Sequence, residues 1–408
     1  MARFSALGAP CQDWSVLSPL LSGLALDNAA ATVSNTLADL VAKPAPAGTQ
    51  HFNGARYISS TANGAGTVPP MAGKMLMVTG QYASSALQFM DISTGALTAG
   101  PTVTEANSLT GGMFIDALRL ADGRFLLVPS RAANFWYYDP YAHTVAQGPA
   151  HGLTTSSTAY AYGGGTVGAD DKAYLSVGQA GGQTPRVHIL DATANTLDTT
   201  NGYQFSYPAN WATVDSSGEV ILLPDGTLLF LTKNGAGSQP MTRVSANGRT
   251  LVASIANANI IYGGCLSPDG KKVVVAAASS NVKYVRLSDN TYVTGPAHGL
   301  SVGATNPFCK VRLHTDGATM LLFPRAATEI CKFDPVNDTV STVANLTTLA
   351  LGAAAASTNA INVTALLNGA YVIHPGTSGL TDFVKFTPLT GTASGFSEGI
   401  AFSRYGER

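Results

Sequence analysis

The acidic residues that could act as acids, bases or metal ligands are spread along the chain. Of the 24 acidic residues, half lie in turn motifs, where an Asp side chain can cap the turn and has a sufficient structural role. Metal-dependent hydrolysis needs several carboxylates or imidazoles that converge on one point. Only Asp116 is expected on a strand at the centre of the fold. We therefore predict no catalytic residue, no metal site, no cofactor and no enzymatic activity.

The 7 histidines include no pair at metal-ligand spacing. Two of them, His151 and His298, lie in the two copies of a repeated sequence motif, Gly-Pro-Ala-His-Gly-Leu. We expect the two copies in equivalent loops, on a face that also carries Arg131, Lys233 and Arg325. One interpretation is that the motif makes a favourable turn between repeat units. The other is that this face binds a ligand or a partner.

Aromatic side chains form a second candidate binding site. Tyr203, Tyr207 and Trp211 lie close together in the sequence and partly outside the predicted strands. Large aromatic rings outside a core are typical of interaction surfaces. We expect this cluster to stack on a carbohydrate or to make a subunit contact.

Two further motifs have ordinary explanations. Gly299–Gly303 matches the Gly-x-Ser-x-Gly pattern of a nucleophile elbow, but no helix follows it, so the strand–turn–helix context is missing. The 4 cysteines show no metal-ligand spacing. Cys309 and Cys331 are separated by an intervening strand, which is too far for a disulfide. We expect buried free thiols.

The elements that must position these residues are short strands joined by tight turns. Seven turn sites recur about every 50 residues, each between two apolar alternating runs, which is a strong hairpin signal. They are Ala72-Gly73, Asp122-Gly123, Asp170-Asp171, Asp225-Gly226, Asp269-Gly270, Asp316-Gly317 and Asn368-Gly369. This period, with four strands per unit, predicts an all-β, seven-bladed β-propeller of four-stranded blades.

The first fifty residues do not fit the repeat. A helix is predicted from Asp27 to Ala42, with one apolar face. The residues of that face are Val33, Leu37, Leu40 and Val41. A Pro-Ala linker from Lys43 to Gly48 follows. We predict an anchoring and linker segment at residues 1–50 and a propeller at residues 51–408. The alternative is that the helix only packs on the propeller.

Composition narrows the classes of function. The net charge of −1 and a charged fraction of 12% argue against a broad nucleic-acid footprint. No apolar run is long enough to span a bilayer, and the first residues do not resemble a secretory signal. We expect no sequence-specific nucleic-acid binding and no membrane insertion.

Leu266–Val275, a strand–turn–strand phrase, resembles the repeats of lactonase-like and WD-like propellers, and the period is similar to that of kelch repeats. The low charge and the abundance of small residues resemble propeller proteins of tailed-phage virions. That resemblance implies a non-enzymatic tail component, such as a nozzle, hub or appendage, localised in the virion. It also implies homo-oligomeric assembly, contacts to other tail subunits through residues 1–48, and adhesion to a host-surface glycan or receptor. The alternatives are a bacterial surface or periplasmic binding propeller, located outside the cytoplasm, and a lactonase-like propeller hydrolase.

Overall fold

The computed structural model describes most of the chain between residues 41 and 386. The described residues are 41–44, 51–60, 62–81, 86–91, 96–105, 113–155, 160–178, 186–205, 219–232, 240–257, 259–300, 307–314, 316–325, 327, 329–345, 362–365, 371–374 and 382–386. They form strands, turns and loops, with no helix among them.

The described strands form seven antiparallel four-stranded sheets, and six of these consist of four strands that are consecutive in the sequence. Blade 1 consists of β2 (His51–Tyr57), β3 (Lys74–Gln81), β4 (Ala86–Asp91) and β5 (Leu97–Thr102). Blade 2 consists of β6 (Phe114–Arg119), β7 (Phe125–Pro129), β8 (Asn134–Asp139) and β9 (Thr144–Ala150). Blade 3 consists of β10 (Tyr162–Val167), β11 (Ala173–Val177), β12 (Val187–Asp191) and β13 (Thr196–Asp198). Blade 4 consists of β14 (Val220–Leu222), β15 (Leu228–Phe230), β16 (Met241–Val244) and β17 (Leu251–Ile255). Blade 5 consists of β18 (Ile261–Leu266), β19 (Lys272–Ala277), β20 (Asn281–Arg286) and β21 (Thr291–Ala297). Blade 6 is β22 (Phe308–Leu313), β23 (Met320–Pro324), β24 (Glu329–Asp334) and β25 (Thr339–Asn345), and blade 7 is β26 (Asn362–Ala365), β27 (Tyr371–His374), β28 (Asp382–Phe386) and β1 (Val41–Pro44).

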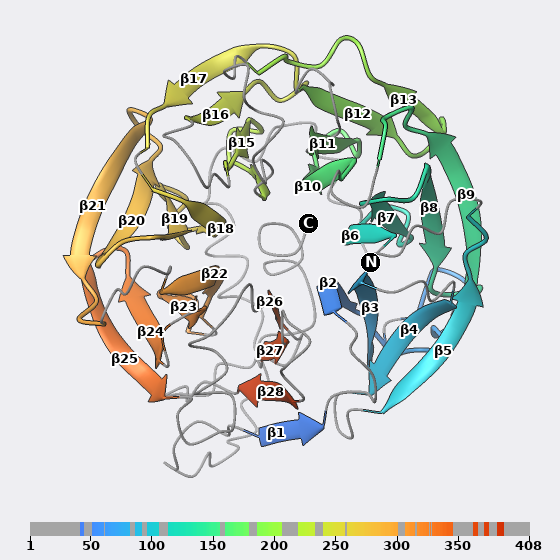
Figure 1. Ribbon diagram of the computed structural model, residues 1–408, viewed down its shortest axis with the longest axis horizontal. Coiled ribbons are helices and arrows are strands. Elements are labelled where there is room, and N and C mark those ends of the chain that lie inside the picture. The colour runs from blue at the N-terminus through green and yellow to red at the C-terminus, as the bar shows by residue number, and fades with distance from the viewer. Residues whose placement is uncertain are drawn as a thin grey trace.

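The blades are arranged radially around a central axis (Figure 1). The first strand of each blade, from β2 to β26, lies nearest the axis, and the fourth strand lies at the rim (Figure 1). This is the architecture of a β-propeller. The prediction of an all-β chain built from repeated four-stranded antiparallel sheets is confirmed.

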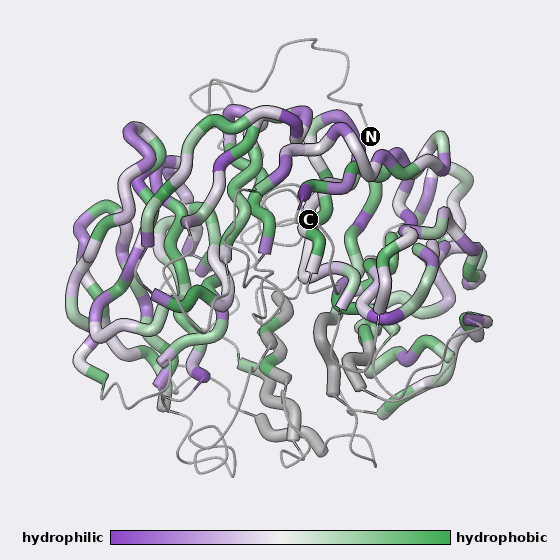
Figure 2. Tube along the Cα trace, turned by 45° about the horizontal axis from the view of Figure 1, so that its top comes forward, coloured by the Kyte–Doolittle hydropathy of each residue, from purple (hydrophilic) through white to green (hydrophobic). Residues whose placement is uncertain are grey.

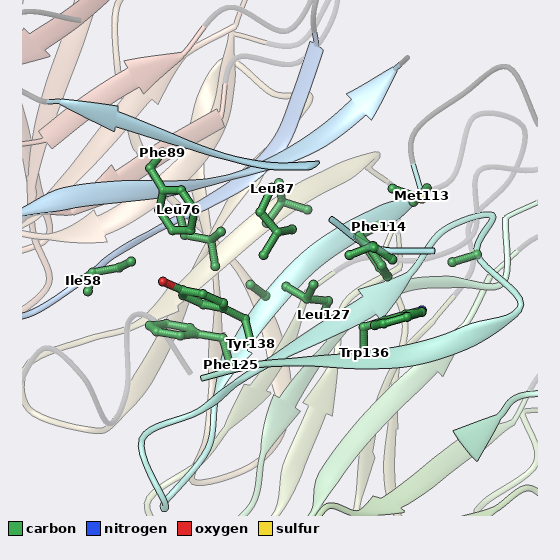
Figure 3. Close-up of a cluster of buried hydrophobic side chains, with 14 residues drawn as sticks. Ile58, Leu76, Leu87, Phe89, Met113, Phe114, Phe125, Leu127, Trp136 and Tyr138 are labelled. Atoms are coloured by element: carbon green, nitrogen blue, oxygen red, sulfur yellow. The ribbon is translucent and has the colours of Figure 1, made fainter. Parts of the chain in front are cut away.

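Apolar side chains between neighbouring blades form the core. The second strands of blades 2, 3 and 6 are buried along their whole length, as expected for strands covered on both faces. Figure 3 shows the cluster between blades 1 and 2, where the rings of Phe89 and Tyr138 contact each other at a tilt of 50°, with centroids 5.3 Å apart. In the coloured parts of the tube in Figure 2, hydrophobic stretches alternate with hydrophilic ones.

In blades 3, 5 and 6 the turn between the third and fourth strands is linked to the preceding blade by a hydrogen bond. Asn195, Asn290 and Asp338 occupy the left-handed position of these turns, with φ between 53° and 55°. The side chain of each accepts a hydrogen bond from the preceding blade: Asn195 from the Tyr137 hydroxyl at 3.1 Å and Asn290 from the Arg243 guanidinium at 2.7 Å. Asp338 accepts from Tyr284 in the same way at 3.0 Å. The turn residues therefore have a structural role, as the sequence predicted.

Blade 7 combines strands from both ends of the described chain. β1 pairs antiparallel with β28 over all four of its residues, from Val41 opposite Lys385 to Pro44 opposite Asp382. An outer strand from the start of the chain thus closes a sheet made by its last described strands.

This pairing corrects the prediction for the amino-terminal segment. The predicted helix over Asp27–Ala42 is wrong at its end, because Val41 and Ala42 lie in strand β1. The first two residues of the predicted linker, Lys43 and Pro44, also lie in β1. The physical reason is that the free edge of β28 offers backbone hydrogen bonds that a short helix end cannot match. Val33, Leu37 and Leu40 lie outside the described residues, and no described segment could cross a membrane as a helix.

Candidate functional site

The two faces of the propeller differ in what they carry. One face, here called the turn face, carries the tight turns between first and second strands and between third and fourth strands. The other, here called the loop face, carries the connections between second and third strands and between consecutive blades. The inner strands begin at the loop face, so their first residues surround the axis where it opens on that face (Figure 1).

One position on the inner strands is polar or glycine in every blade. In blades 2, 3, 5 and 6 it pairs with the last residue but one of the second strand: Asp116 with Val128, Gly164 with Ser176, Gly263 with Ala276 and Lys310 with Phe323. In blade 1 it is Gly54, opposite Val78, and in blade 7 it is Asn362, opposite His374, the last residue of β27. In blade 4 it is Glu219, whose carbonyl accepts a hydrogen bond from Leu231 at 3.0 Å. We call these seven residues the axial ring.

The backbone is irregular beside the axial ring. In blades 1, 2, 3, 5 and 6 the pairing of first and second strands skips one residue immediately before the ring position. Such bulges redirect side chains and are common next to active sites. The repeated bulge makes the ring the best candidate for a functional site among the described residues.

Charged ring residues pair across blades. Arg56 of blade 1 contacts the Asp116 carboxylate at 2.9 Å. Glu219 of blade 4 pairs with Lys310 of blade 6, and the guanidinium of Arg312 lies 3.7 Å from the same carboxylate. The Glu219–Lys310 pair therefore spans the whole width of blade 5.

Glycines in blade 5 make that span possible. The Gly264 amide donates a hydrogen bond of 2.9 Å to the Glu219 carboxylate. A Cβ atom on Gly263 would lie 2.9 Å from the carboxylate oxygen and 3.0 Å from Cδ of Lys310. A side chain at this position would thus push the ion pair apart.

The Glu219 carboxylate is held ionised. Burial alone would raise its pKa, but Lys310 and Arg312, with the Gly264 amide, lower the pKa to about 2. An acid with this pKa is deprotonated at neutral pH and does not donate a proton. Its role here is to fix the position of Lys310.

An arginine–tyrosine stack lies beside this pair. The Arg325 guanidinium lies 4.0 Å from the ring centroid of Tyr262, and Tyr262 is the bulged residue immediately before Gly263. Burial raises the pKa of the nearby Cys309 thiol to about 12, and Lys310, Arg325 and Arg312 oppose that shift. Lys310 and Arg312 lie on one inner strand, β22, and Arg325 follows the second strand of the same blade, β23. We call Glu219, Tyr262, Lys310, Arg312 and Arg325 the axial cationic site.

The predicted loop-face residues are only partly brought together. Arg131 and Arg325 occupy equivalent places, because their amides donate to the carbonyls of Met113 and Pro307, each the residue before an inner strand. Arg131 is buried and lies 5.2 Å from the Tyr160 ring centroid. Lys233 lies outside the described residues.

The two repeated histidines are structural. In His151, Nε2 lies 2.6 Å from the Ala132 carbonyl, and Nδ1 accepts a hydrogen bond from the Leu153 amide at 3.0 Å. His298 repeats this with the Ser279 carbonyl at 2.7 Å and the Leu300 amide at 3.2 Å. Both rings are buried and both use their two nitrogens on backbone groups. The interpretation as a favourable turn fits this geometry, and the interpretation as ligand contacts does not.

The aromatic cluster does not form a described binding surface. Tyr203 packs edge-on against Phe205, with centroids 5.5 Å apart, and borders the core between blades 3 and 4. Tyr207 and Trp211 lie outside the described residues. Cys265, Cys309 and Cys331 are buried free thiols, as predicted.

A buried histidine makes stability depend on pH. Nδ1 of His188 and the Tyr162 hydroxyl share a hydrogen bond of 2.8 Å. Burial, with the nearby His151 and Arg186, lowers the pKa of His188 from 6.5 to about 4. The unfolded chain therefore binds a proton between pH 6.5 and 4 that the native chain does not bind. The stabilising contribution is complete above pH 6.5 and is lost as the pH falls towards 4.

We expect the free energy of unfolding to fall by about 3 kcal/mol from His188 alone over that range. Urea unfolding at pH 7.5 and 4.5 measures it, and His188→Gln should reduce the pH response. His143→Asn, at a left-handed turn position that Asn also tolerates, is the matched control and should keep the response. An unchanged response in His188→Gln would contradict the assignment.

Most of the axial cationic site was not predicted from the sequence. Arg325 was a predicted binding residue, but Glu219, Tyr262, Lys310 and Arg312 were not. One signal in the sequence could have marked Glu219 as equivalent to Asp116. Each of the two acids lies four residues before the first hydrogen-bonded residue of a hairpin turn, which is Leu223 for Glu219 and Leu120 for Asp116. Among the described residues, no three His, Cys, Asp or Glu side chains are grouped so that they could bind a metal ion.

Comparisons with solved structures support the fold. A streptogramin B lyase is 12% identical over 86% of this chain and 97% of that chain, with a TM-score of 0.56. A catalytically inactive histidine-to-alanine variant of virginiamycin B lyase from Staphylococcus aureus, with quinupristin, is 10% identical over 86% and 100%, with a TM-score of 0.57. The selenomethionine-substituted form of that lyase is 9% identical over 86% and 100%, with a TM-score of 0.56. What they share with this chain is a fold. No protein-family model and no curated protein matches the sequence.

These comparisons correct two predictions. The non-enzymatic virion role and the absence of enzymatic activity are contradicted, because the structures that share this fold are lyases, which are enzymes. The phage-tail resemblance rested on composition, and small residues with few charges follow from packing narrow blades around an axis in a propeller of any function.

Proposed function

We propose that this seven-bladed propeller is an enzyme that cleaves a carbon–oxygen bond next to a carbonyl group, as a lyase or a hydrolase, at the axial cationic site. The observation that supports it most is the pair of cations on one inner strand, Lys310 and Arg312, with Lys310 fixed by an ionised Glu219. Both reactions place negative charge on a carbonyl oxygen, and preorganised cations stabilise such charge.

The two reactions differ in what happens to the atoms. In an elimination, a base removes the proton next to the carbonyl carbon, a carbon–carbon double bond forms, and the leaving oxygen departs with the electrons of the broken bond. In a hydrolysis, water adds to the carbonyl carbon, the bond from that carbon to the ester oxygen breaks, and this oxygen leaves as an alcohol with a proton from the water. Lys310 and Arg325 would donate to the carbonyl oxygen in either case.

The similarity to lyases is the second support. The similar structures are those of a streptogramin B lyase and of virginiamycin B lyase, and one structure of the latter was determined with quinupristin. This suggests a cyclic or linear ester as the substrate class, with quinupristin as the first compound to test.

The test is incubation of the purified chain with quinupristin and with a panel of lactones, followed by mass spectrometry. We expect at least one compound to be opened, with unchanged mass for an elimination or with one added water for a hydrolysis. Lys310→Met should lower the rate at least about tenfold, while Arg286→Gln, an exposed surface change on β20, should not. If every compound stays intact, or if Lys310→Met is fully active, the proposal is wrong.

A further inference from the structure

We infer that Asn63, in the connection between β2 and β3 on the turn face, is a site of self-modification, where the side-chain amide is lost and an acidic residue forms. The inference does not depend on the proposed function. In an Asn-Gly pair, the glycine nitrogen can attack the side-chain carbonyl carbon of the asparagine, because glycine has no Cβ to hinder the approach. The chain contains six such pairs, and the structure describes four of them, those that begin at Asn53, Asn63, Asn201 and Asn247.

The reaction at Asn63 needs water and no other reactant. A bond forms between the Gly64 nitrogen and Cγ of Asn63, the bond from Cγ to Nδ2 breaks, and ammonia leaves with the proton of the Gly64 amide. The product is a cyclic imide. Water then adds to one of the two imide carbonyl carbons and breaks the bond from that carbon to the nitrogen. The result is aspartate or isoaspartate, and either one adds a negative charge to the turn face.

The side chain of Asn63 is oriented for this attack. Its Oδ1 accepts hydrogen bonds from the Ala65 amide at 3.0 Å and from the Thr67 amide at 2.9 Å. These bonds fold the side chain towards the residues that follow it, which brings Cγ to the side of the Gly64 backbone. Two N–H donors on one carbonyl oxygen also stabilise the negative charge that develops on it when the nitrogen adds to Cγ.

The attacking nitrogen is accessible. Gly64 is exposed, and a Cβ atom built on it would meet no atom within 4 Å. Among the described residues, none accepts a hydrogen bond from the Gly64 amide. The amide can therefore approach Cγ without first breaking a contact within the described structure, and water can reach the imide.

The pair at Asn201 is held in an unreactive arrangement. Nδ2 of Asn201 donates to the two carboxylate oxygens of Asp198, at 3.1 Å and 3.0 Å. These bonds direct the leaving group back along the chain, away from the glycine that follows. Gly202 is buried and packs so closely that a Cβ atom on it would lie 1.8 Å from the Val187 carbonyl oxygen. The backbone here cannot shift to bring the nitrogen onto the side chain.

The two other described pairs are also restrained. The Gly248 nitrogen, which would attack Asn247, donates to the Ser245 carbonyl at 2.8 Å, so the attack would break the turn. Asn53 lies in β2, where pairing with β3 fixes the extended backbone. Of the four described pairs, only that at Asn63 combines an oriented side chain with an accessible nitrogen.

The test is incubation of the full chain at mildly alkaline pH, followed by digestion and mass spectrometry, which detects the exchange of NH2 for OH at each asparagine. We expect the half-life of Asn63 to be at least about tenfold shorter than those of Asn201 and Asn247. In the urea-unfolded chain the three half-lives should be alike, because the contacts that separate them are lost. Gly64→Ala should lengthen the half-life of Asn63 about tenfold, and the open space around Gly64 accommodates the added methyl group.

Two variants identify the modified residue in isoelectric focusing. Asn63→Gln would have to close a larger ring, so it should abolish the early acidic form of the folded chain, whereas the matched change Asn247→Gln should leave that form unchanged. A half-life of Asn63 in the folded chain as long as that of Asn201 or Asn247 would overturn the inference. An acidic form that appears just as fast with Asn63→Gln would also overturn it.

Discussion

Removal of residues 1–46 should destabilise the propeller clearly more than removal of residues 1–38 does. Only the longer truncation deletes β1, which pairs with β28 over four residues. The loss of these backbone hydrogen bonds should lower the free energy of unfolding by roughly 3 kcal/mol. It also leaves the edge of β28 open to other chains. Urea unfolding and size-exclusion chromatography of both truncations measure the two effects.

A peptide provides the control. A synthetic peptide of residues 39–50, added to the longer truncation, should restore stability in a concentration-dependent way, because it can supply the missing strand in trans. A peptide of the same composition in scrambled order should not. If the two truncations are equally stable, β1 contributes nothing and the closure of blade 7 by β1 is wrong.

Replacement of Glu219 should also lower the free energy of unfolding strongly. Glu219→Gln leaves Lys310 and Arg312 beside a neutral group at a place where the side chains of the three residues are 9% to 29% exposed. Breaking a fully buried ion pair costs about 3–5 kcal/mol, and partial exposure reduces that, so we expect about 2 kcal/mol. The free energy of unfolding from urea titration at pH 7 measures it.

A double-mutant cycle isolates the pair itself. Lys310→Met alone should also destabilise, and the double variant should cost clearly less than the sum of the two single changes, because neither residue is then left without its partner. Asp289→Asn breaks the exposed Arg286–Asp289 pair and should change stability little. Additive effects of Glu219→Gln and Lys310→Met would show that the two side chains are not coupled.

The repeated sheets were predictable because hairpin signals are local. Asp-Gly turns specify a positive φ at the glycine, as at Gly123, Gly226 and Gly270, and this requirement does not depend on the rest of the fold. The strand at Val41–Pro44 was not predictable in the same way. Its partner lies at the other end of the sequence, and four residues carry too little pattern to outweigh a helical one.

The axial cationic site was hidden for a related reason. Glu219 and Lys310 are brought together by three consecutive blades, so no spacing in the sequence marks them as a pair. The repeated histidine motif, in contrast, was visible but misleading. Repetition of a loop indicates repeated geometry, and His151 and His298 repeat a backbone contact rather than a ligand contact.

The closure of blade 7 has a consequence for synthesis on the ribosome. Blades 1 to 6 consist of strands consecutive in the sequence, so each can form from local contacts soon after it emerges. β1 is made before blade 1, yet its partner β28 begins only at Asp382. The nascent chain must therefore keep β1 unpaired while every other blade is translated. We expect ring closure to come late in folding, and until then the unpaired strand edges of the incomplete propeller are sites where aggregation can start.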